Sequence, residues 1–304
     1  MRDAFVRALT EIVASDPDVM LVNGDLGFGV LDDFIARFPA NYVNAGVAEQ
    51  NMTAVACGMA LAGARAYTYS IGNFPTLRCL EQLRNDVCYH RADVTVVAVG
   101  GGFSYGQLGM SHFATEDLAI LRALPEMAVV APSDPWQAYA LTHQLHARGG
   151  PSYLRLDKGR AGLPEGAVEL GKVREVRPGA DAVIFATGAI LGEAVAAADE
   201  LASEGASIRV IDVHTIKPLD VDGICAAARD CGIVVTLEEH SVIGGLGGAV
   251  AEVCLEGGVP VRKFRRFGID DRYPEIVGDQ AYMRVHFGLD HNAVAVGLRE
   301  MLGL

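Results

Sequence analysis

Two side chains in the first half of the sequence can move protons, and a third offers a flat apolar face. Glu49 follows the turn NAG at 44–46 and opens a helix predicted over 47–64. The helix dipole favours a carboxylate there, so the residue type alone does not require catalysis. His112 lies in GMSHF, and imidazole exchanges protons near neutral pH. Phe74, in SIGNFPTL, can stack on a ligand ring or fill the core.

The segments around these residues predict a parallel sheet. Continuously apolar runs alternate with Ala- and Leu-rich stretches, which is typical of strands buried on both faces and separated by helices. The predicted strands are 18–23, 66–70, 93–99, 127–132 and 152–156, and the further helices are 76–90, 115–123 and 134–147.

The same alternation resumes after a segment rich in Gly, Pro and charge. It predicts strands at 180–187, 207–213, 232–239 and 259–265, with helices at 191–204, 219–229 and up to 256. We therefore predict an α/β protein with two doubly wound domains, at 1–160 and 179–304. The intervening residues 161–178 are predicted to be a linker with a short β excursion.

Two glycine clusters invite a nucleotide-binding interpretation: VGGGFSYG at 99–106 and GGLGGA at 244–249. Neither is a GxGxxG motif in the first strand-to-helix turn of a domain, so this interpretation is not favoured. The first cluster follows a predicted strand, where ligands bind in parallel sheets, and is expected to form an active-site loop. The second is expected to be a tight turn with close backbone packing.

The composition disfavours several classes of protein. The 304 residues carry a formal net charge of −13 without a basic tract, which argues against nucleic-acid binding. No apolar run reaches the ~18 residues of a membrane span and no signal-peptide core is visible, so a soluble, cytoplasmic protein is expected. The six cysteines are expected to be free and buried. His143 and His146 lack matching ligands, so no metal site is expected there.

Several stretches, in the same order, resemble the transketolase family, whose members use thiamine diphosphate. In the first domain they are GDLG at 24–27, the stretch from NAGVAEQN to NDVCYH at 44–90, GMSHFATEDLAILRALPEMAVVAPSD at 109–134 and GPSYLRLDKG at 150–159. In the second, SIRVIDVHTIKPLD at 207–220 and LEEHSVIGGLGG at 237–248 resemble the C-terminal domain shared by transketolases, deoxyxylulose-phosphate synthases and E1 β subunits. The resemblance spans essentially the whole chain and implies a pyrimidine-binding domain followed by a transketolase C-terminal domain.

The resemblance implies roles for four residues. Glu49 matches the carboxylate that hydrogen-bonds a ring nitrogen of the cofactor's aminopyrimidine and thereby activates the cofactor. Phe74 matches aromatic residues that stack on this ring, and Asp25 matches an acidic residue near the cofactor pocket. His112 matches a histidine that assists proton movement at the substrate oxygens.

The resemblance also implies that basic residues bind substrate. Arg2 matches an arginine that holds a sugar phosphate, and Arg155 and Lys158 lie in the family's other phosphate-contacting segment, where the sequence leaves open which one counts. Leu108 stands where transketolases place an Asp that recognises a sugar hydroxyl, and Gly100 stands where they place a His. Fewer polar groups favour a less hydroxylated or unusual acceptor.

The sequence contains no GDG motif, with which the family grips the diphosphate through Mg²⁺. The chain therefore resembles the C-terminal half of a split transketolase. A separate N-terminal subunit is implied to supply the diphosphate and Mg²⁺ site, in an α2β2 heterotetramer. The expected reaction moves a two-carbon ketol unit from a ketose or its phosphate to an aldose, only when the partner is present.

Three alternatives remain open. An E1 β-like subunit would decarboxylate 2-oxoacids, and an acyloin-forming enzyme similar to deoxyxylulose-phosphate synthase would join two substrates. A non-catalytic scaffold would keep only the fold. His240, in the second domain, is expected to be structural.

Overall fold

Seven strands form the sheet of the first domain, in a computed structural model that describes all 304 residues. Their order is β10-β5-β6-β4-β3-β1-β2, and all pairs are parallel except β10 with β5. Every residue of β4 is buried, because helices cover both faces of the sheet. The strands are β1 (Val19–Asn23), β2 (Tyr42–Asn44), β3 (Arg65–Ile71), β4 (Val94–Val99), β5 (Ala128–Val130), β6 (Ser152–Leu156) and β10 (Thr215–Lys217).

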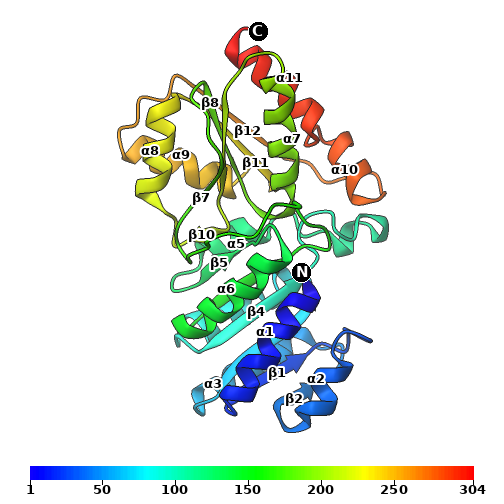
Figure 1. Cartoon of the computed structure of the whole chain (residues 1–304). Coiled ribbons are helices and arrows are strands. Elements are labelled where there is room, and N and C mark those ends of the chain that lie inside the picture. The colour runs from blue at the N-terminus through cyan, green and yellow to red at the C-terminus, as the bar shows by residue number, and fades with distance from the viewer.

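Two helices, α1 and α6, pack against each other on one face of this sheet, and α3 lies on the other (Figure 1). The side chains of the strands alternate between these faces, so each face contributes to a separate apolar cluster. The helices are α1 (Arg2–Ser15), α2 (Asp32–Arg37), α3 (Glu49–Leu61), α4 (Leu80–Gln82), α5 (Asp117–Ala123) and α6 (Pro135–Arg148).

The helix predicted over 76–90 is not one regular α-helix. A 3₁₀ turn, η2 (Leu77–Cys79), leads through α4 into a wider π-helical segment, η3 (Leu83–Cys88). Further 3₁₀ turns are η1 (Pro39–Asn41), η4 (Gly106–Leu108), η5 (Met110–His112) and η6 (Gly188–Ile190). Such irregular helical turns often accompany functional sites, and η2 and η5 carry or adjoin the residues discussed below.

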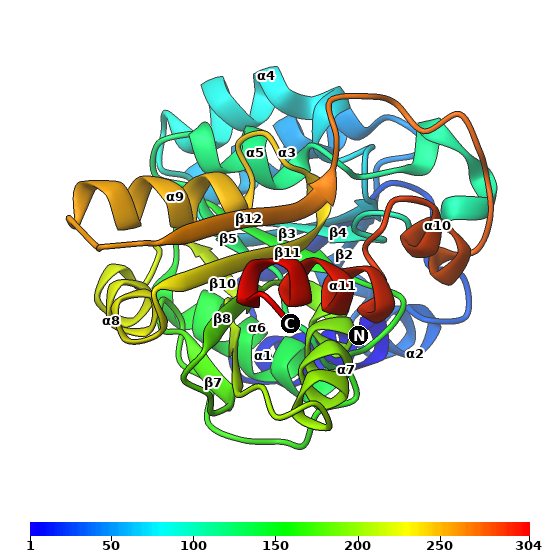
Figure 2. The ribbon, with the colours of Figure 1, turned by 90° about the horizontal axis from the view of Figure 1, so that it is seen from above.

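The second domain contains a five-stranded sheet in the order β12-β11-β8-β9-β7. Helices α7 and α11 lie side by side on one face, and α8 packs beside α9 (Figure 2). The elements are β7 (Arg174–Arg177), β8 (Ala182–Ala186), α7 (Leu191–Ala202), β9 (Ile208–Asp212), α8 (Val221–Cys231), β11 (Ile233–Ser241), α9 (Leu246–Glu256), β12 (Lys263–Ile269), α10 (Gln280–His286) and α11 (His291–Leu302).

The boundary between the two domains differs in two places from a simple linker. Strand β7 lies within the segment 161–178 and pairs antiparallel with β9, so part of this segment belongs to the second sheet. Strand β10 follows β9 in sequence but joins the first sheet, where Thr215 pairs with Val130. The prediction of two α/β domains is confirmed, and each of these short edge strands extends one of the sheets.

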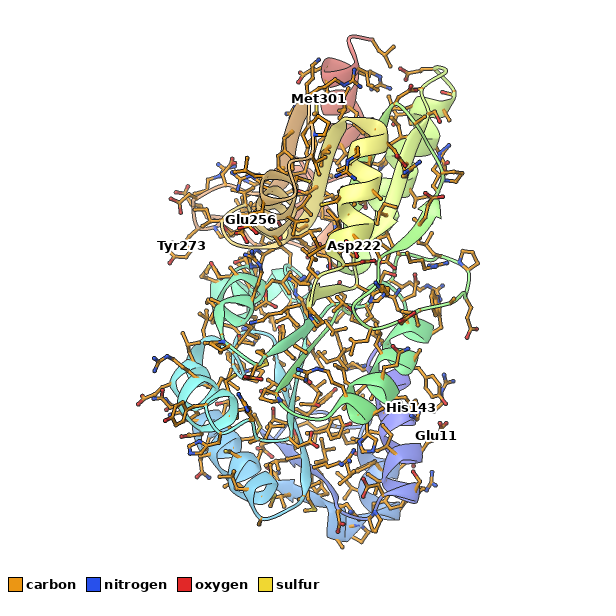
Figure 3. All side chains as sticks on the ribbon, turned by 90° about the vertical axis from the view of Figure 1, so that its left-hand side faces the viewer. Glu11, His143, Asp222, Glu256, Tyr273 and Met301 are labelled. Atoms are coloured by element: carbon orange, nitrogen blue, oxygen red, sulfur yellow. The ribbon has the colours of Figure 1, made fainter.

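Other structural predictions can be compared directly. All six cysteines are free and buried, as expected. His143 Nε2 points to Glu11 Oε2 of α1 at 3.4 Å (Figure 3), and His146 Nε2 lies 3.5 Å from Asp16 Oδ2. These two histidines therefore join α6 to α1 through separate ion pairs. None of the helices combines the length and apolar character needed to cross a bilayer.

Candidate active site

Four of the predicted site residues lie at one edge of the first sheet. Asp25, Glu49, Phe74 and His112 are in the segments that follow β1, β2, β3 and β4, respectively. These strands are parallel, so their carboxyl ends meet at the same edge. The topology thereby gathers residues that are up to 87 positions apart in the sequence.

Glu49 is the first residue of α3, and only 3% of its side chain is exposed. Its Oε2 accepts a hydrogen bond from Nη1 of Arg78 at 2.7 Å. A buried carboxylate is costly without a positive partner or a hydrogen-bond donor, and here Arg78 is the partner. Glu49 therefore presents a fixed, desolvated acceptor at the sheet edge.

Aromatic rings continue the row of side chains from Arg78. The guanidinium carbon of Arg78 lies 4.6 Å from the centroid of the Phe74 ring. The Phe74 ring meets the His112 ring edge-on at a centroid distance of 5.2 Å, and Tyr105 lies 6.2 Å beyond His112. Glu49, Phe74 and His112 are thus brought into one continuous cluster, with Arg78 between the first two.

Asp25 lies nearby in an unusual backbone conformation. Its φ is 59°, in the left-handed region that few residues other than glycine adopt. Its exposed Oδ1 accepts a hydrogen bond from Asn44 Nδ2 at 2.8 Å, which ties the loop after β1 to the end of β2. Residues held in such conformations cluster at functional sites, which supports a role for Asp25 without specifying one.

The glycine-rich loop at 99–106 forms the next part of the edge. Gly100 has a φ of 96°, and a side chain there would collide with the Tyr105 ring, 2.3 Å from the Cβ position. Tyr105 therefore packs against the backbone at the position where transketolases place a histidine. Burial raises the pKa of Tyr105, while the positive charge of Arg2 opposes this shift.

A cavity of about 350 Å³ adjoins this loop. It is lined by residues of the loop, by Lys158 and by the start of α10: Ser104, Tyr105, Gly106, Gln107, Leu108, Lys158, Asp279 and Gln280. The Lys158 ammonium lies 4.6 Å from the centroid of the Tyr105 ring. The second domain therefore contributes part of the wall of a cavity that continues the row from Glu49 to Tyr105.

The three predicted phosphate-binding residues are separated by the structure. Lys158 is exposed beside the cavity, and Arg2, on α1, is close enough to Tyr105 to affect its pKa. Arg155, in contrast, is buried, with 1% of its side chain exposed. The structure brings Lys158 and Arg2 to the site region but places Arg155 in the interior, so Lys158 is the better candidate for a substrate contact.

Arg155 instead joins the two domains. Its Nε donates to Asp117 Oδ2 at 2.9 Å, and its Nη2 donates to the backbone oxygens of Ala114 and Glu239, also at 2.9 Å. Burial acts against the charge of the guanidinium, but Asp117 and Asp157 raise the pKa of Arg155 above its usual value. Burial also raises the pKa of Asp157, against the effect of Arg155.

The second domain supports the glycine-rich loop through a buried glutamate. Glu239 Oε1 accepts from the backbone N of Phe103 at 2.6 Å and from Gln280 Nε2 at 2.8 Å, and its Oε2 accepts from Arg284 Nε at 2.5 Å. A Cβ at Gly102 would lie 2.5 Å from the same carboxylate. Glycine is required there because the loop passes directly over Glu239.

The neighbouring residues of β11 have structural roles. Glu238 accepts hydrogen bonds from the backbone N of Leu246 and of Gly247, both at 2.7 Å, so it caps the start of α9. A Cβ at Gly245 would overlap the Glu238 carboxylate, which confirms the predicted tight turn. His240 is fully buried and accepts from the backbone N of Ala119 at 3.2 Å, as expected for a structural histidine.

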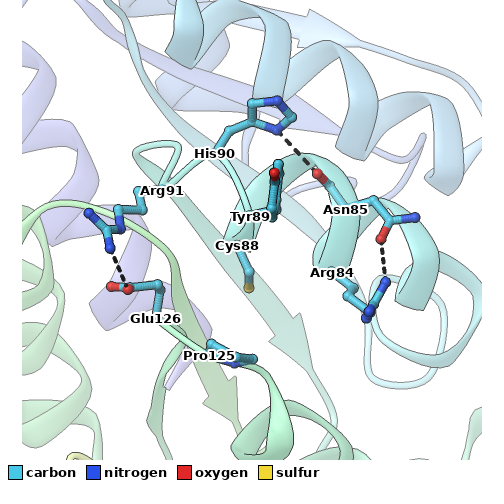
Figure 4. Close-up of a pocket in the computed structure, with 8 residues that line it drawn as sticks. All are labelled: Arg84, Asn85, Cys88, Tyr89, His90, Arg91, Pro125 and Glu126. Atoms are coloured by element: carbon cyan, nitrogen blue, oxygen red, sulfur yellow. Dashed lines mark hydrogen bonds and ion pairs between the residues drawn. The ribbon is translucent and has the colours of Figure 1, made fainter.

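A larger groove, of about 710 Å³, lies elsewhere (Figure 4). It is lined by residues 84–91 before β4 and by Pro125 and Glu126 before β5, so it lies at the amino edge of the sheet. The Arg91–Glu126 ion pair, at 3.2 Å, crosses it. It contains none of the predicted site residues, and parallel sheets bind ligands at the opposite edge.

The residues present fit an aminopyrimidine ring. Glu49 supplies a buried acceptor for a ring N–H, and Phe74 supplies an aromatic surface in the same cluster. For a metal ion the chain offers no group of three or more His, Cys, Asp or Glu side chains in a suitable arrangement. The donor set of this chain therefore matches the pyrimidine end of thiamine diphosphate rather than its diphosphate end.

Sequence reasoning missed three residues of this arrangement. Arg78, Tyr105 and Glu239 each act through a neighbour that is distant in sequence or brought close by a loop. The only available signals were the repeated glycines at 100–102 and the charge of Arg78 close to Phe74. Neither signal indicates a partner without the fold.

Comparisons with known proteins agree with this arrangement. The sequence matches the family model of the transketolase pyrimidine-binding domain over residues 1–162, and that of the transketolase C-terminal domain over residues 171–294. A solved structure described as a split gene transketolase, inactive beta4 tetramer, superposes with a TM-score of 0.88 at 33% identity, and the match covers 100% of this chain and 98% of that chain.

Curated relatives include both split and long enzymes. One of the two kinds of chain of an apulose-4-phosphate transketolase from Phocaeicola vulgatus is 35% identical, over 96% of this chain and 94% of the relative. A 6-deoxy-6-sulfo-D-fructose transketolase subunit of a Clostridium species is 36% identical, over 99% and 94%. The 1-deoxy-D-xylulose-5-phosphate synthase of Syntrophotalea carbinolica is 35% identical over 98% of this chain but only 47% of the relative. The chain belongs to the transketolase family and consists of its pyrimidine-binding and C-terminal domains.

Proposed function

We propose that this chain is the pyrimidine-binding subunit of a two-subunit, thiamine-diphosphate-dependent transketolase that transfers a two-carbon ketol unit. The observation that carries the proposal is the buried Glu49 carboxylate in one cluster with Phe74 and His112. The names of the split relatives support a subunit of this type.

Each residue of the cluster has a separate task. When bound, thiamine diphosphate supplies a carbon nucleophile that proteins lack. Glu49 holds a proton at the aminopyrimidine ring nitrogen, and its burial excludes water from that contact. Phe74 orients the ring by stacking, and His112, which touches Phe74, exchanges protons with substrate oxygens.

The partner surface in this proposal is the carboxyl edge of the first sheet. Exposed apolar side chains lie in the same loops as the site: Phe28, Val47, Leu77, Leu108 and Met110. Phe28 is 82% and Val47 74% exposed, which is unusual for large apolar residues. Apolar side chains gathered around a site are typical of a protein interface. A diphosphate-binding subunit with Mg²⁺ would cover these residues and complete the cofactor site, in an α2β2 heterotetramer.

The substrate in this proposal is an anionic ketose outside the standard pentose phosphates. Leu108 and Gly100 remove two polar groups, and Tyr105 fills the space over Gly100. Lys158 and Arg2 provide positive charge near the cavity. The substrates named for the two split relatives also carry an anionic group, a phosphate in one and a sulfo group in the other.

The decisive test is reconstitution. We expect no turnover of a ketose phosphate by this chain alone with thiamine diphosphate and Mg²⁺, and turnover once the diphosphate-binding subunit is co-expressed. The inactive beta4 form of the structural relative is consistent with the first result. Turnover by the isolated chain would refute the two-subunit proposal. Failure of the mixture to bind thiamine diphosphate would favour the scaffold.

A synthase activity is the second candidate, because 1-deoxy-D-xylulose-5-phosphate synthases match nearly the whole chain. Product analysis separates the two. The mixture is supplied either with a ketose phosphate and an aldose or with pyruvate and an aldose phosphate. Carbon dioxide released from pyruvate would identify the synthase or an E1 β-like decarboxylase, whereas an exchanged ketose would identify the transketolase.

Replacing Phe74 by Leu is expected to raise the Kd of thiamine diphosphate about tenfold in the two-subunit complex, because the aromatic stacking surface is lost while most of the apolar volume stays. Calorimetric titration measures the Kd. Phe74→Tyr is the matched control, since it keeps the ring and should bind normally. An unchanged Kd in Phe74→Leu would show that Phe74 is only a core residue.

A further inference from the structure

The guanidinium group of Arg78 makes the two contacts that the proposed function assigns to the aminopyrimidine. Its Nη1 lies 2.7 Å from Glu49 Oε2, and its Cζ lies over the face of the Phe74 ring, 4.6 Å from the centroid. We propose that Arg78 is a positioning residue that substitutes for the cofactor's ring in the empty subunit and leaves when the ring binds. This inference rests on the proposed function.

The substitution is chemically plausible because the two groups resemble each other. A guanidinium is planar, presents N–H donors in its plane and stacks on aromatic faces. The aminopyrimidine is also planar and would use the same carboxylate and the same aromatic face. Both groups cannot stand between Glu49 and Phe74 together, so cofactor binding requires Arg78 to move.

The ion pair is asymmetric, which makes this movement possible. Glu49 is held at the start of α3 with 3% of its side chain exposed, whereas 47% of the Arg78 side chain is exposed. The guanidinium has no other hydrogen bond in the structure. Arg78 can therefore swing towards solvent or the partner while Glu49 stays in place.

Arg78 also has a clear purpose before the cofactor arrives. Without it, Glu49 would be a buried carboxylate with no positive partner, which destabilises a folded chain. Arg78 thus stabilises the empty subunit and keeps Glu49 and Phe74 in their positions. The same contact must be broken when the ring binds, so it weakens the net affinity for the cofactor.

Arg78→Met is therefore expected to have effects of opposite sign in two measurements. The Tm of the isolated chain falls, because Glu49 loses its partner. The Kd of thiamine diphosphate with Mg²⁺, titrated calorimetrically into the two-subunit complex, falls about tenfold, because no group has to be displaced. A residue with only a structural role would weaken binding or leave it unchanged. Arg78→Lys keeps the charge without the planar stack and should restore most of the Tm while binding the cofactor with an intermediate Kd.

The outcomes separate this inference from the proposed function. If the wild-type complex binds thiamine diphosphate but Arg78→Met binds it equally or more weakly, the inference alone is overturned. An unchanged Tm in the isolated Arg78→Met chain overturns it too, because the pair with Glu49 then contributes nothing. If the wild-type complex does not bind the cofactor at all, the proposed function fails first and this inference fails with it.

Discussion

Replacing Glu49 by Gln in the two-subunit enzyme is expected to lower kcat about a thousandfold, within the range for loss of a positioned proton-transfer group. An amide is nearly the same size as the carboxylate, but it cannot hold a proton at the aminopyrimidine nitrogen. The buried position of Glu49 at the start of α3 leaves no water to replace it. Steady-state turnover and the Kd of thiamine diphosphate measure the effect.

The control for this experiment is Glu256→Gln, at the exposed end of α9. It removes the same charge far from the site and should leave kcat unchanged. The Glu49→Gln complex should still assemble and bind thiamine diphosphate, so that the loss lies in kcat. More than about a tenth of wild-type turnover in this variant would contradict the assignment of Glu49 as the activating residue.

Replacing Arg155 by Met is expected to lower the free energy of unfolding by about 3–5 kcal/mol, because the buried Asp117 carboxylate loses its partner. The hydrogen bonds from Arg155 to the backbone of Ala114 and Glu239 are lost as well. Urea denaturation of the isolated chain, followed by circular dichroism, measures the change.

Lys158→Met is the matched variant for this prediction, because Lys158 is exposed beside the cavity. It should change stability by less than about 0.5 kcal/mol and raise the KM for an anionic substrate in the two-subunit enzyme. If Arg155→Met instead kept wild-type stability and raised KM selectively, Arg155 would be the substrate contact and its interior role would be refuted.

The sequence was sufficient to predict most of the sheet framework. Buried parallel strands such as β4 and β6 are continuously apolar, so their bounds were predicted to within a residue or two. Helices α10 and α11 were missed because α10 is short and mostly exposed and α11 follows it without a strand. The predicted helix over 76–90 contains irregular turns whose geometry depends on tertiary packing.

The candidate site was predictable only where motifs match a family. Glu49, Phe74 and His112 were identified from such motifs, and the structure places them in one cluster. Arg78 had no signal, because its pairing with Glu49 depends on how the loop after β3 meets the start of α3. The choice between Arg155 and Lys158 required burial, which sequence spacing along one strand end does not provide.

Strand β10 makes the two halves of this chain interdependent. It leaves the second domain only to complete the edge of the first sheet, where Ala131 N also donates to His214 O at 2.8 Å. A fragment cut at the linker would leave β5 with unpaired N–H and C=O groups, which favour edge-to-edge aggregation. Chimaeras that exchange the C-terminal domain between relatives must therefore exchange a fitting edge strand with it, so the useful unit of recombination is the whole chain.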